Sequence, residues 1–416
     1  MNADLPEDRT VPARQGPFGL LRSVVVSPTT TTALFYALMG LGFSGSHLLL
    51  AKFLPALEYA QIALAIAVIQ LAKEFSPLGA QGVIVRHRLD PDRRMLIRVS
   101  WTCAVVGVVV ATCAAPVYGL DPTTTLLLGA GIVASGVTYV AAAFYQARQA
   151  FVPAMFLSQC SNLVLLAGAV AVIVLPVRGI WLTLAIIVVG YVVSAVWSWS
   201  RLLSGVHEPP EARAFSWREA LSYTIVSGAS PVLVQSERLF IPKLLSLEDL
   251  ATFGVLAAVV LSPYKTLQVG ASFTAFPRLR AAETVRERRR LLAKEALILT
   301  VFVAGGGLVL AWLTPVVVEL FLEGKYELGG GLIWAGLAVG ALRTYSGLAR
   351  AAAMALCTTR ELGVVGGLVW VAVGVALAGA VVGASWGLTG LVLGIAAGWV
   401  TLIAAYAVPA ARHLRD

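Results

Sequence analysis

The sequence predicts an all-α polytopic membrane protein with 12 transmembrane helices. Of the 416 residues, 58% are hydrophobic and only 13% are charged, with a mean hydropathy of +0.84, whereas soluble domains carry roughly 25% charged residues. Apolar runs of about 20 residues, long enough to cross the hydrocarbon core of a bilayer, recur along the chain. A chain of this composition needs lipid as its solvent.

The expected spans follow from these apolar runs. Their approximate limits are 29–51, 57–78, 97–118, 123–145, 152–175, 179–200, 218–240, 250–276, 292–314, 331–356, 363–382 and 385–408. Residues 1–28 are polar and lack the apolar centre of a signal peptide, so we expect a disordered cytoplasmic tail.

Lysine and arginine gather in alternate loops, which sets the expected orientation. With the N-terminus inside, the outer loops hold only Lys52, Arg178, Lys243 and Lys325, while the inner segments hold most of the other cations, including those of 86–98 and 278–294. One missed span would invert every later loop. The pattern therefore favours 12 spans with both termini cytoplasmic.

An internal repeat divides the chain into two halves. Shifted by 191 residues, "KFLPALEYAQIALAIAV" (Lys52–Val68) aligns with "KLLSLEDLATFGVLAAV" (Lys243–Val259). Six spans per half give a parallel repeat about an axis along the membrane normal, with substrate expected between the lobes. The expected units are two six-helix bundles at 29–200 and 218–408, a cytoplasmic linker at 201–217 and a cytoplasmic tail at 409–416.

The repeat also pairs polar positions within the spans. His47 aligns with Arg238, and Lys73-Glu74 aligns with Tyr264-Lys265. From the helix rise, His47 and Arg238 lie roughly 7 Å below the outer mouth, and the two lysines roughly 24 Å below it. The two halves are thus expected to offer cations at two matched depths.

Charged side chains within spans are the candidate site, because each costs about 2.5–3.5 kcal/mol to insert. Cations outnumber carboxylates there, and the surplus needs a wet cavity or an anionic ligand. Lys73, Glu74 and Arg350 could instead reach the inner headgroups, and Glu237-Arg238 could be an exposed cap of a shorter helix. The candidates for substrate binding are Arg238, Lys265, Arg343, His47, Lys73 and Arg350, and those for ion or proton coupling are Glu237 and Glu74.

Other polar groups in the spans have simpler interpretations. We expect the amides Gln70, Gln81, Gln159, Asn162, Gln235 and Gln268 to join helices more often than to contact a ligand.

The cysteines Cys103, Cys113, Cys160 and Cys357 lie in apolar runs without metal-ligand spacing, so we expect core fillers and no metal. The chain has no phosphate-binding loop of the ATPase type, and no cofactor or catalytic residue is expected. The basic loop at 278–296 is expected to contact anionic lipids rather than nucleic acid.

Two segments resemble a known family. "AKFLPALEYAQIALAIAVIQLAKEFSPLGAQGVIVRHR" (Ala51–Arg88) resembles the opening of polysaccharide-unit exporters, and "ERLFIPKLLSLEDLATFGVLAAVV…FTAFPRL" (Glu237–Leu279) resembles its second-half counterpart. The superfamily is that of the multidrug/oligosaccharidyl-lipid/polysaccharide exporters. Twelve spans fit its O-antigen flippase branch, whereas the lipid-II branch usually carries two further helices.

The resemblance implies a function and roles for individual residues. Such flippases move an undecaprenyl-diphosphate-linked oligosaccharide across the bacterial cytoplasmic membrane for surface polysaccharide biosynthesis in the cell envelope. Two bundles forming a V rock between inward-open and outward-open states, and cavity cations hold the diphosphate. By position that role falls to Arg238, Lys265 and Arg343, with His47 and Lys73 second. The implied partners are the anionic lipid-linked glycan, membrane lipids, and a glycan polymerase or glycosyltransferases.

Three other functions stay open from the sequence. A multidrug-type cation antiporter shares the fold, but its cavity should favour carboxylates over cations. A membrane glycosyltransferase or polymerase usually needs an acidic site and a large outer loop, and the outer loops expected here are short. A scaffold without transport activity is the third alternative.

Overall fold

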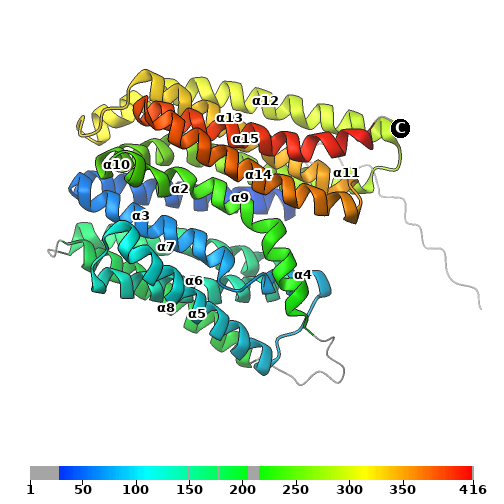
Figure 1. The fold of residues 1–416 in the computed structure, drawn as a ribbon, viewed down its shortest axis with the longest axis horizontal. Helices are drawn as coiled ribbons and strands as arrows, with labels where there is room; N and C mark the ends of the chain where they lie inside the picture. Colours follow the sequence, from blue (N-terminus) through cyan, green and yellow to red (C-terminus); the bar gives the residue numbers. More distant parts are fainter. Residues whose placement is uncertain (1–27, 149, 176–178, 205–214, 415–416) are drawn as a thin grey trace, which may run out of the picture.

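A computed structural model describes residues 28–148, 150–175, 179–204 and 215–414, and every regular element within these ranges is a helix (Figure 1). The expected tail at 1–27, most of the expected linker (205–214) and residues 415–416 lie outside the described residues.

The described residues of the first half form seven helices. They are α2 (Pro28–Phe53), α3 (Ala56–Phe75), α4 (Ala80–His87), α5 (Arg93–Tyr118), α6 (Pro122–Ala147), α7 (Phe151–Val174) and α8 (Ile180–Ser204). The expected second span ends early, at Phe75, because the chain turns through Leu78 and Gly79, both with positive φ, before α4 begins. A Cβ at Gly79 would lie 1.9 Å from the Ala220 carbonyl oxygen, so only glycine permits this close crossing of α9.

The described residues of the second half form seven further α-helices. They are α9 (Trp217–Leu244), α10 (Leu247–Leu256), α11 (Ser262–Ala281), α12 (Val285–Val316), α13 (Gly330–Leu356), α14 (Thr359–Ala384) and α15 (Gly387–Arg412). A π-helical turn, η1 (Ala257–Leu261), joins α10 to α11, and another, η2 (Val317–Phe321), extends α12. Pro231 lies inside α9, which continues past it to Leu244.

The chain is a multi-pass membrane protein, with ten helical segments in the described residues that are long and apolar enough to span a bilayer. Helices α2 and α9 occupy the expected first and seventh spans but are not among the ten. Helix α9 carries charges at both ends as well as Glu237 and Arg238 in its interior, and these charges lower its apolar character.

The helix boundaries follow the sequence repeat. Helix α2 ends at Phe53 and α9 at Leu244, while α3 begins at Ala56 and α10 at Leu247, so both pairs of boundaries differ by 191 residues. The halves then diverge. Gly79 lies in the turn between α3 and α4, whereas its repeat partner Gly270 lies within the uninterrupted α11.

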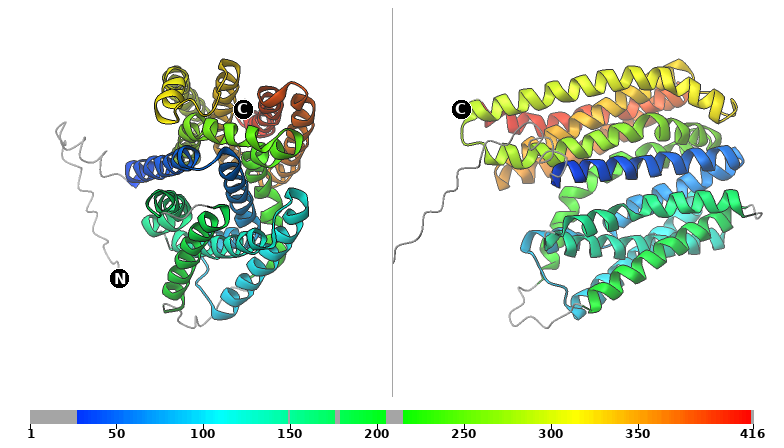
Figure 2. Two further views of the ribbon diagram at one scale, coloured as in Figure 1. Left: turned by 90° about the vertical axis from the view of Figure 1, so that its left-hand side faces the viewer. Right: turned by 180° about the vertical axis from the view of Figure 1, so that it is seen from behind.

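Helices α4 to α8 pack mainly on one another, with α6 in contact with α3, α4, α5, α7 and α8, and α2 packs chiefly on α7. Helices α9 to α15 form a second group, in which α13 contacts α11, α12 and α15. Contacts between the groups come from α2, α3 and α4 against α9, α10 and α11. In Figure 1, α5 and α8 diverge from α12 and α15 towards the right, and Figure 2 shows α2 beginning towards the side where α15 ends.

The cysteines differ in burial. Cys103 and Cys160 are buried, as expected of core fillers, and Cys357 is half-buried. The expectation is wrong for Cys113, which is exposed on α5. Helix α5 packs chiefly on α6, so much of its surface points away from the protein core.

Candidate functional site

A cavity of about 540 Å³ lies between the two groups of helices. Residues of α3, α4, α6 and α7 line one side, and residues of α9, α11 and α13 line the other. Its wall includes the cations Lys73, Lys265 and Arg350 and the carboxylate of Glu74. Lys265 and Arg350 are exposed and Lys73 is half-buried, so three cations reach the same space. None of the three has an ion-pair partner among the described residues.

The rest of the wall is rich in neutral polar groups. All six amides that we expected to join helices line this cavity: Gln70, Gln81, Gln159, Asn162, Gln235 and Gln268. Gln268 does both, because its Nε2 also donates to Ser346 Oγ on α13 at 3.2 Å. The sequence did not place these amides around one cavity, although their number within apolar spans was a usable signal.

A narrower space of about 40 Å³ adjoins the cavity and shares with it Gln70, Asn162, Val234, Gln235 and Lys265. Its wall also includes Phe43, Arg238 and Arg343, with Ala257 and Leu261 from the π-helical turn η1. The Arg238 guanidinium carbon lies 5.1 Å from the Phe43 ring centre, and Lys265 Nζ lies 5.7 Å from it. These are cation–π distances. The sequence predicts different depths for the two cations, but their side chains converge on one aromatic ring.

Arg343 and Glu237 form a buried ion pair between α13 and α9. Nη2 of Arg343 lies 2.5 Å from Oε1 of Glu237, and both residues are almost inaccessible to solvent. The Arg343 guanidinium also lies over the Trp399 ring at 5.2 Å. The other carboxylate oxygen of Glu237 and Nε of Arg343 are buried without a hydrogen-bond partner in the described protein. The burial of Glu237 excludes the alternative of an exposed helix cap.

His47, the repeat partner of Arg238, is fully buried beside the narrow space. Its ring centre lies 4.4 Å from that of Phe43, and its Nδ1 is 3.1 Å from the Tyr59 hydroxyl. Its Nε2 is buried and has no hydrogen-bond partner in the described structure. The repeat-related residues His47 and Arg238 therefore both contact Phe43.

Contacts between the two halves close the end of the molecule at the α2–α3 turn. The loop between η2 and α13 reaches this turn, where Lys325 Nζ donates to the carbonyl oxygens of Ala51, at 2.8 Å, and Leu54. The Tyr326 hydroxyl donates to the Ala51 carbonyl at 3.1 Å, and Lys52 pairs with Glu323 at 3.2 Å. Burial raises the pKa of Tyr326 to about 12 and lowers the pKa of Lys325 below its ordinary value.

A second junction joins α4 to α9. His87 Nε2 lies 2.9 Å from Oε1 of Glu219, and the Arg86 guanidinium lies 3.2 Å from the same oxygen. Glu219 stands in the first turn of α9, where the helix dipole also favours a negative charge. This junction borders the cavity, because Gln81, Gly82 and Val85 of α4 are part of its wall.

Residues 49–327 match the family model described as "Polysaccharide biosynthesis protein". The chain belongs to this family. No curated protein sequence matches the chain.

Solved structures show the fold. A structure described as the lipid II flippase MurJ in an inward closed conformation matches with a TM-score of 0.62 and 12% identity, over 91% of this chain and 86% of that one. An inward-facing multidrug resistance MATE family transporter of the MOP superfamily matches with a TM-score of 0.57 and 11% identity, over 92% and 98%. An outward-facing MATE family structure gives 0.50 and 14%, over 94% and 97%.

Together these findings confirm the resemblance to the multidrug/oligosaccharidyl-lipid/polysaccharide exporters. The fold is that of membrane transporters and flippases, and the family is one of polysaccharide biosynthesis.

Proposed function

We propose that this protein is a flippase that moves an undecaprenyl-diphosphate-linked oligosaccharide across the bacterial cytoplasmic membrane for surface polysaccharide biosynthesis. One observation carries the proposal: among the described residues, a cavity between the two halves presents Lys73, Lys265 and Arg350 but only one carboxylate, Glu74. Such a cavity attracts an anion, and a diphosphate is the anion that a lipid-linked sugar carries. The polysaccharide biosynthesis family supports the same substrate class.

The proposed membrane arrangement has 12 spans with both termini cytoplasmic. Helices α2 and α9 complete the ten apolar spans, because their ends follow the repeat that relates the two halves. The units 29–200 and 218–408 then form the two lobes, joined by the linker at 201–217. The cavity faces the cytoplasm, since the basic segments 86–98 and 278–294 lie at that side in this arrangement.

The proposed substrate pose assigns each part of the ligand to a matching surface. Lys73, Lys265 and Arg350 hold the diphosphate, with Arg350 able to grip two oxygens as a fork. The cavity amides hydrogen-bond sugar hydroxyls in either direction, as donor or acceptor. The polyprenyl chain stays in the bilayer and does not leave apolar surroundings.

The narrow space beyond the cavity has a different role in this proposal. Arg238 lies there over Phe43 with no carboxylate at ion-pair distance in the described residues, so it is the next anion site as the diphosphate advances. Arg343 is already neutralised by Glu237 and orders α13 against α9. His47 contacts Phe43 from behind and sets its position rather than meeting the substrate.

Transport by alternating access requires the closed end to open. The Lys325, Tyr326 and Lys52 contacts at the α2–α3 turn would then break, and the cavity would close at its other end. Glu74 in the cavity and Glu237 beside Arg343 are the carboxylates that an ion or proton could use for coupling. Glycosyltransferases that build the lipid-linked glycan and a polymerase that extends it are the proposed partners.

The multidrug cation antiporter finds less support, although MATE family structures share the fold. A cationic drug would meet three cations and one carboxylate in this cavity. The glycosyltransferase alternative lacks an acidic cluster at the cavity wall among the described residues. The cavity charges therefore favour an anionic substrate.

The test is a flipping assay with purified protein in liposomes that contain a fluorescent polyprenyl-diphosphate oligosaccharide. Wild type should expose the glycan on the far leaflet, measured by its accessibility to an added glycosidase. A Lys265→Gln/Arg350→Gln variant should flip at least about tenfold more slowly, whereas the matched variant Arg148→Gln, at an exposed ion pair outside the cavity, should equal wild type. Equal rates for all three, or no flipping by wild type, would refute the proposal.

A further inference from the structure

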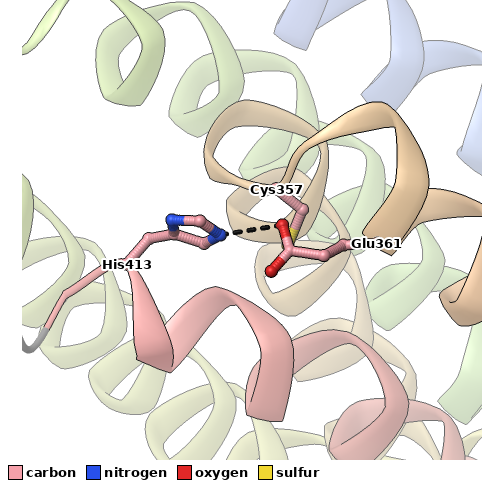
Figure 3. A group of neighbouring side chains, drawn as sticks. All are labelled: Cys357, Glu361 and His413. Carbon is pink, nitrogen blue, oxygen red and sulfur yellow. Dashed lines mark hydrogen bonds and ion pairs between the residues drawn. The ribbon is translucent and has the colours of Figure 1, made fainter.

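A separate group of side chains lies between the α13–α14 turn and the end of α15. Cys357 caps the end of α13, Glu361 lies in the first turn of α14, and His413 follows the last residue of α15. Their ligand atoms all lie within 4.8 Å of one another, and the three side chains converge in Figure 3. This group is distinct from the cavity, because none of the three residues lines it.

We propose that Cys357, Glu361 and His413 form a binding site for a zinc ion. A thiolate, an imidazole nitrogen and a carboxylate oxygen are the three ligand types that proteins use for Zn²⁺. The thiol disfavours Mg²⁺ and Ca²⁺, which prefer oxygen ligands throughout. The thiolate and the carboxylate together supply two negative charges, which neutralise the charge of the ion.

The distances fit such an ion after a small adjustment. Zinc ligands at about 2.0–2.3 Å from the metal stand roughly 3.5 Å apart in a tetrahedron. Atoms that already lie within 4.8 Å of one another need to move by only about 1 Å to reach that arrangement. Nε2 of His413 and Oε2 of Glu361 are 2.9 Å apart, so an ion between the side chains would replace this contact.

Glu361 is held in place by groups around it. Its Oε2 accepts hydrogen bonds from the Thr358 backbone N–H and the Thr358 hydroxyl, both at 2.8 Å, as part of a capping box. The contacts of Thr358 and His413 all use Oε2, and none of them uses Oε1. Metal-binding carboxylates are commonly oriented by hydrogen bonds of this kind.

The exposure of the group also suits a metal ion. All three residues are half-buried, so an ion can enter and still lose much of its water. The contact between His87 and Glu219, at the junction of α4 and α9, lacks these features. Arg86 pairs with the same carboxylate there and would repel a cation, and no cysteine belongs to a comparable group in the described residues.

A bound ion would fix the end of the last helix in the C-terminal half. It would tie the end of α15 to the turn between α13 and α14, and these helices already pack closely on one another. A Cβ at Gly379 of α14 would lie 2.2 Å from the Gly394 carbonyl oxygen of α15, so the two backbones touch. With three protein ligands, the fourth position is filled by water.

The test uses full-length protein in detergent, purified with a peptide tag that contains no histidine. After treatment with EDTA, the protein is titrated with ZnCl₂, and bound zinc is measured by mass spectrometry. Wild type should bind one zinc per chain, and CoCl₂ should give the near-ultraviolet absorption band of a cobalt–thiolate bond. Cys357→Ser and His413→Gln should each bind at least about 100-fold more weakly, and Cys357→Ser should lose the cobalt band.

The matched control is Cys113→Ser, which removes an exposed cysteine of α5 and should bind zinc like wild type. Zinc should also raise the melting temperature of wild type and of Cys113→Ser but not that of Cys357→Ser. Failure of wild type to bind zinc, or equal zinc affinity in wild type and Cys357→Ser, would overturn the proposal. If Cys357→Ser does not fold, the zinc affinity of His413→Gln tests the proposal in its place.

Discussion

Arg343 Nη2 on α13 lies 2.5 Å from Glu237 Oε1 on α9, in the buried interior of the second half. Glu237 pairs with a residue 106 positions away in the sequence. Its neighbour Arg238 lines the narrow space beside the cavity instead. Adjacent residues on a helix point about 100° apart. One of the two charges is therefore paired within the protein, and we propose that the other is available to a ligand.

Removing one partner of the Arg343–Glu237 ion pair should destabilise the fold more than replacing both partners with apolar residues. We expect Glu237→Ala to lower the free energy of unfolding by about 3–5 kcal/mol, because the Arg343 guanidinium would stay buried without its partner. The double variant Glu237→Leu/Arg343→Met should recover most of that loss. Thermal unfolding in detergent measures both. A double variant as unstable as Glu237→Ala would show that the pair stabilises by more than mutual neutralisation.

Removing a cavity cation should slow transport without lowering the stability of the fold. Lys265→Gln takes away a charge that has no ion-pair partner in the described structure and shares its cavity with Lys73 and Arg350. We expect the melting temperature to stay the same or rise, because repulsion between like charges falls, while flipping slows by at least about tenfold. Comparison of the melting curve with the flipping rate checks this. A slow variant that also unfolds early would assign Lys265 a structural role.

The sequence predicts the positions of the helices well because local properties determine them. Apolar runs and the 191-residue repeat place α2, α3, α9 and α10, whose shared boundaries the structure confirms. The break after Phe75 was missed, because hydropathy does not reveal that Leu78 and Gly79 adopt positive φ. Pattern alone thus locates spans and overlooks turns within them.

The partners of the site residues were beyond the sequence, because they depend on how each helix is rotated and packed. Nothing local to Glu237 indicates that Arg343 faces it from α13. Trp399, 56 positions beyond Arg343, stacks against the same guanidinium. The group of Cys357, Glu361 and His413 also forms only when the last helix returns beside the start of α14.

The closed end at the α2–α3 turn should open more readily without Lys325. Its ammonium donates to the carbonyl oxygens of Ala51 and Leu54 and so joins the two halves. In a variant whose four native cysteines are replaced by serine, we place a cysteine at Ser158 in the cavity wall. Lys325→Ala should increase the labelling of this cysteine by a membrane-impermeant thiol reagent added from the outer side.

Lys52→Ala is the matched control for that measurement. Lys52 pairs with Glu323 at the same end, but the Glu323 side chain is 77% exposed, so the pair stabilises little. We expect its labelling to stay close to that of the parent. Equal labelling of all three proteins would mean that the contacts of Lys325 do not hold this end closed.

The two glycines related by the repeat should respond differently to the same substitution. Gly79 has φ of +77°, and a Cβ there would lie 1.9 Å from the Ala220 carbonyl oxygen, so Gly79→Ala must push α4 away from α9. We expect it to lower the free energy of unfolding by about 1–3 kcal/mol or more. At Gly270, inside α11, a Cβ would meet no atom within 4 Å, and alanine should stabilise the helix by about 0.5–1 kcal/mol. The melting temperatures of both variants test this difference. Equal destabilisation by Gly270→Ala and Gly79→Ala would contradict the role of Gly79 in the turn between α3 and α4.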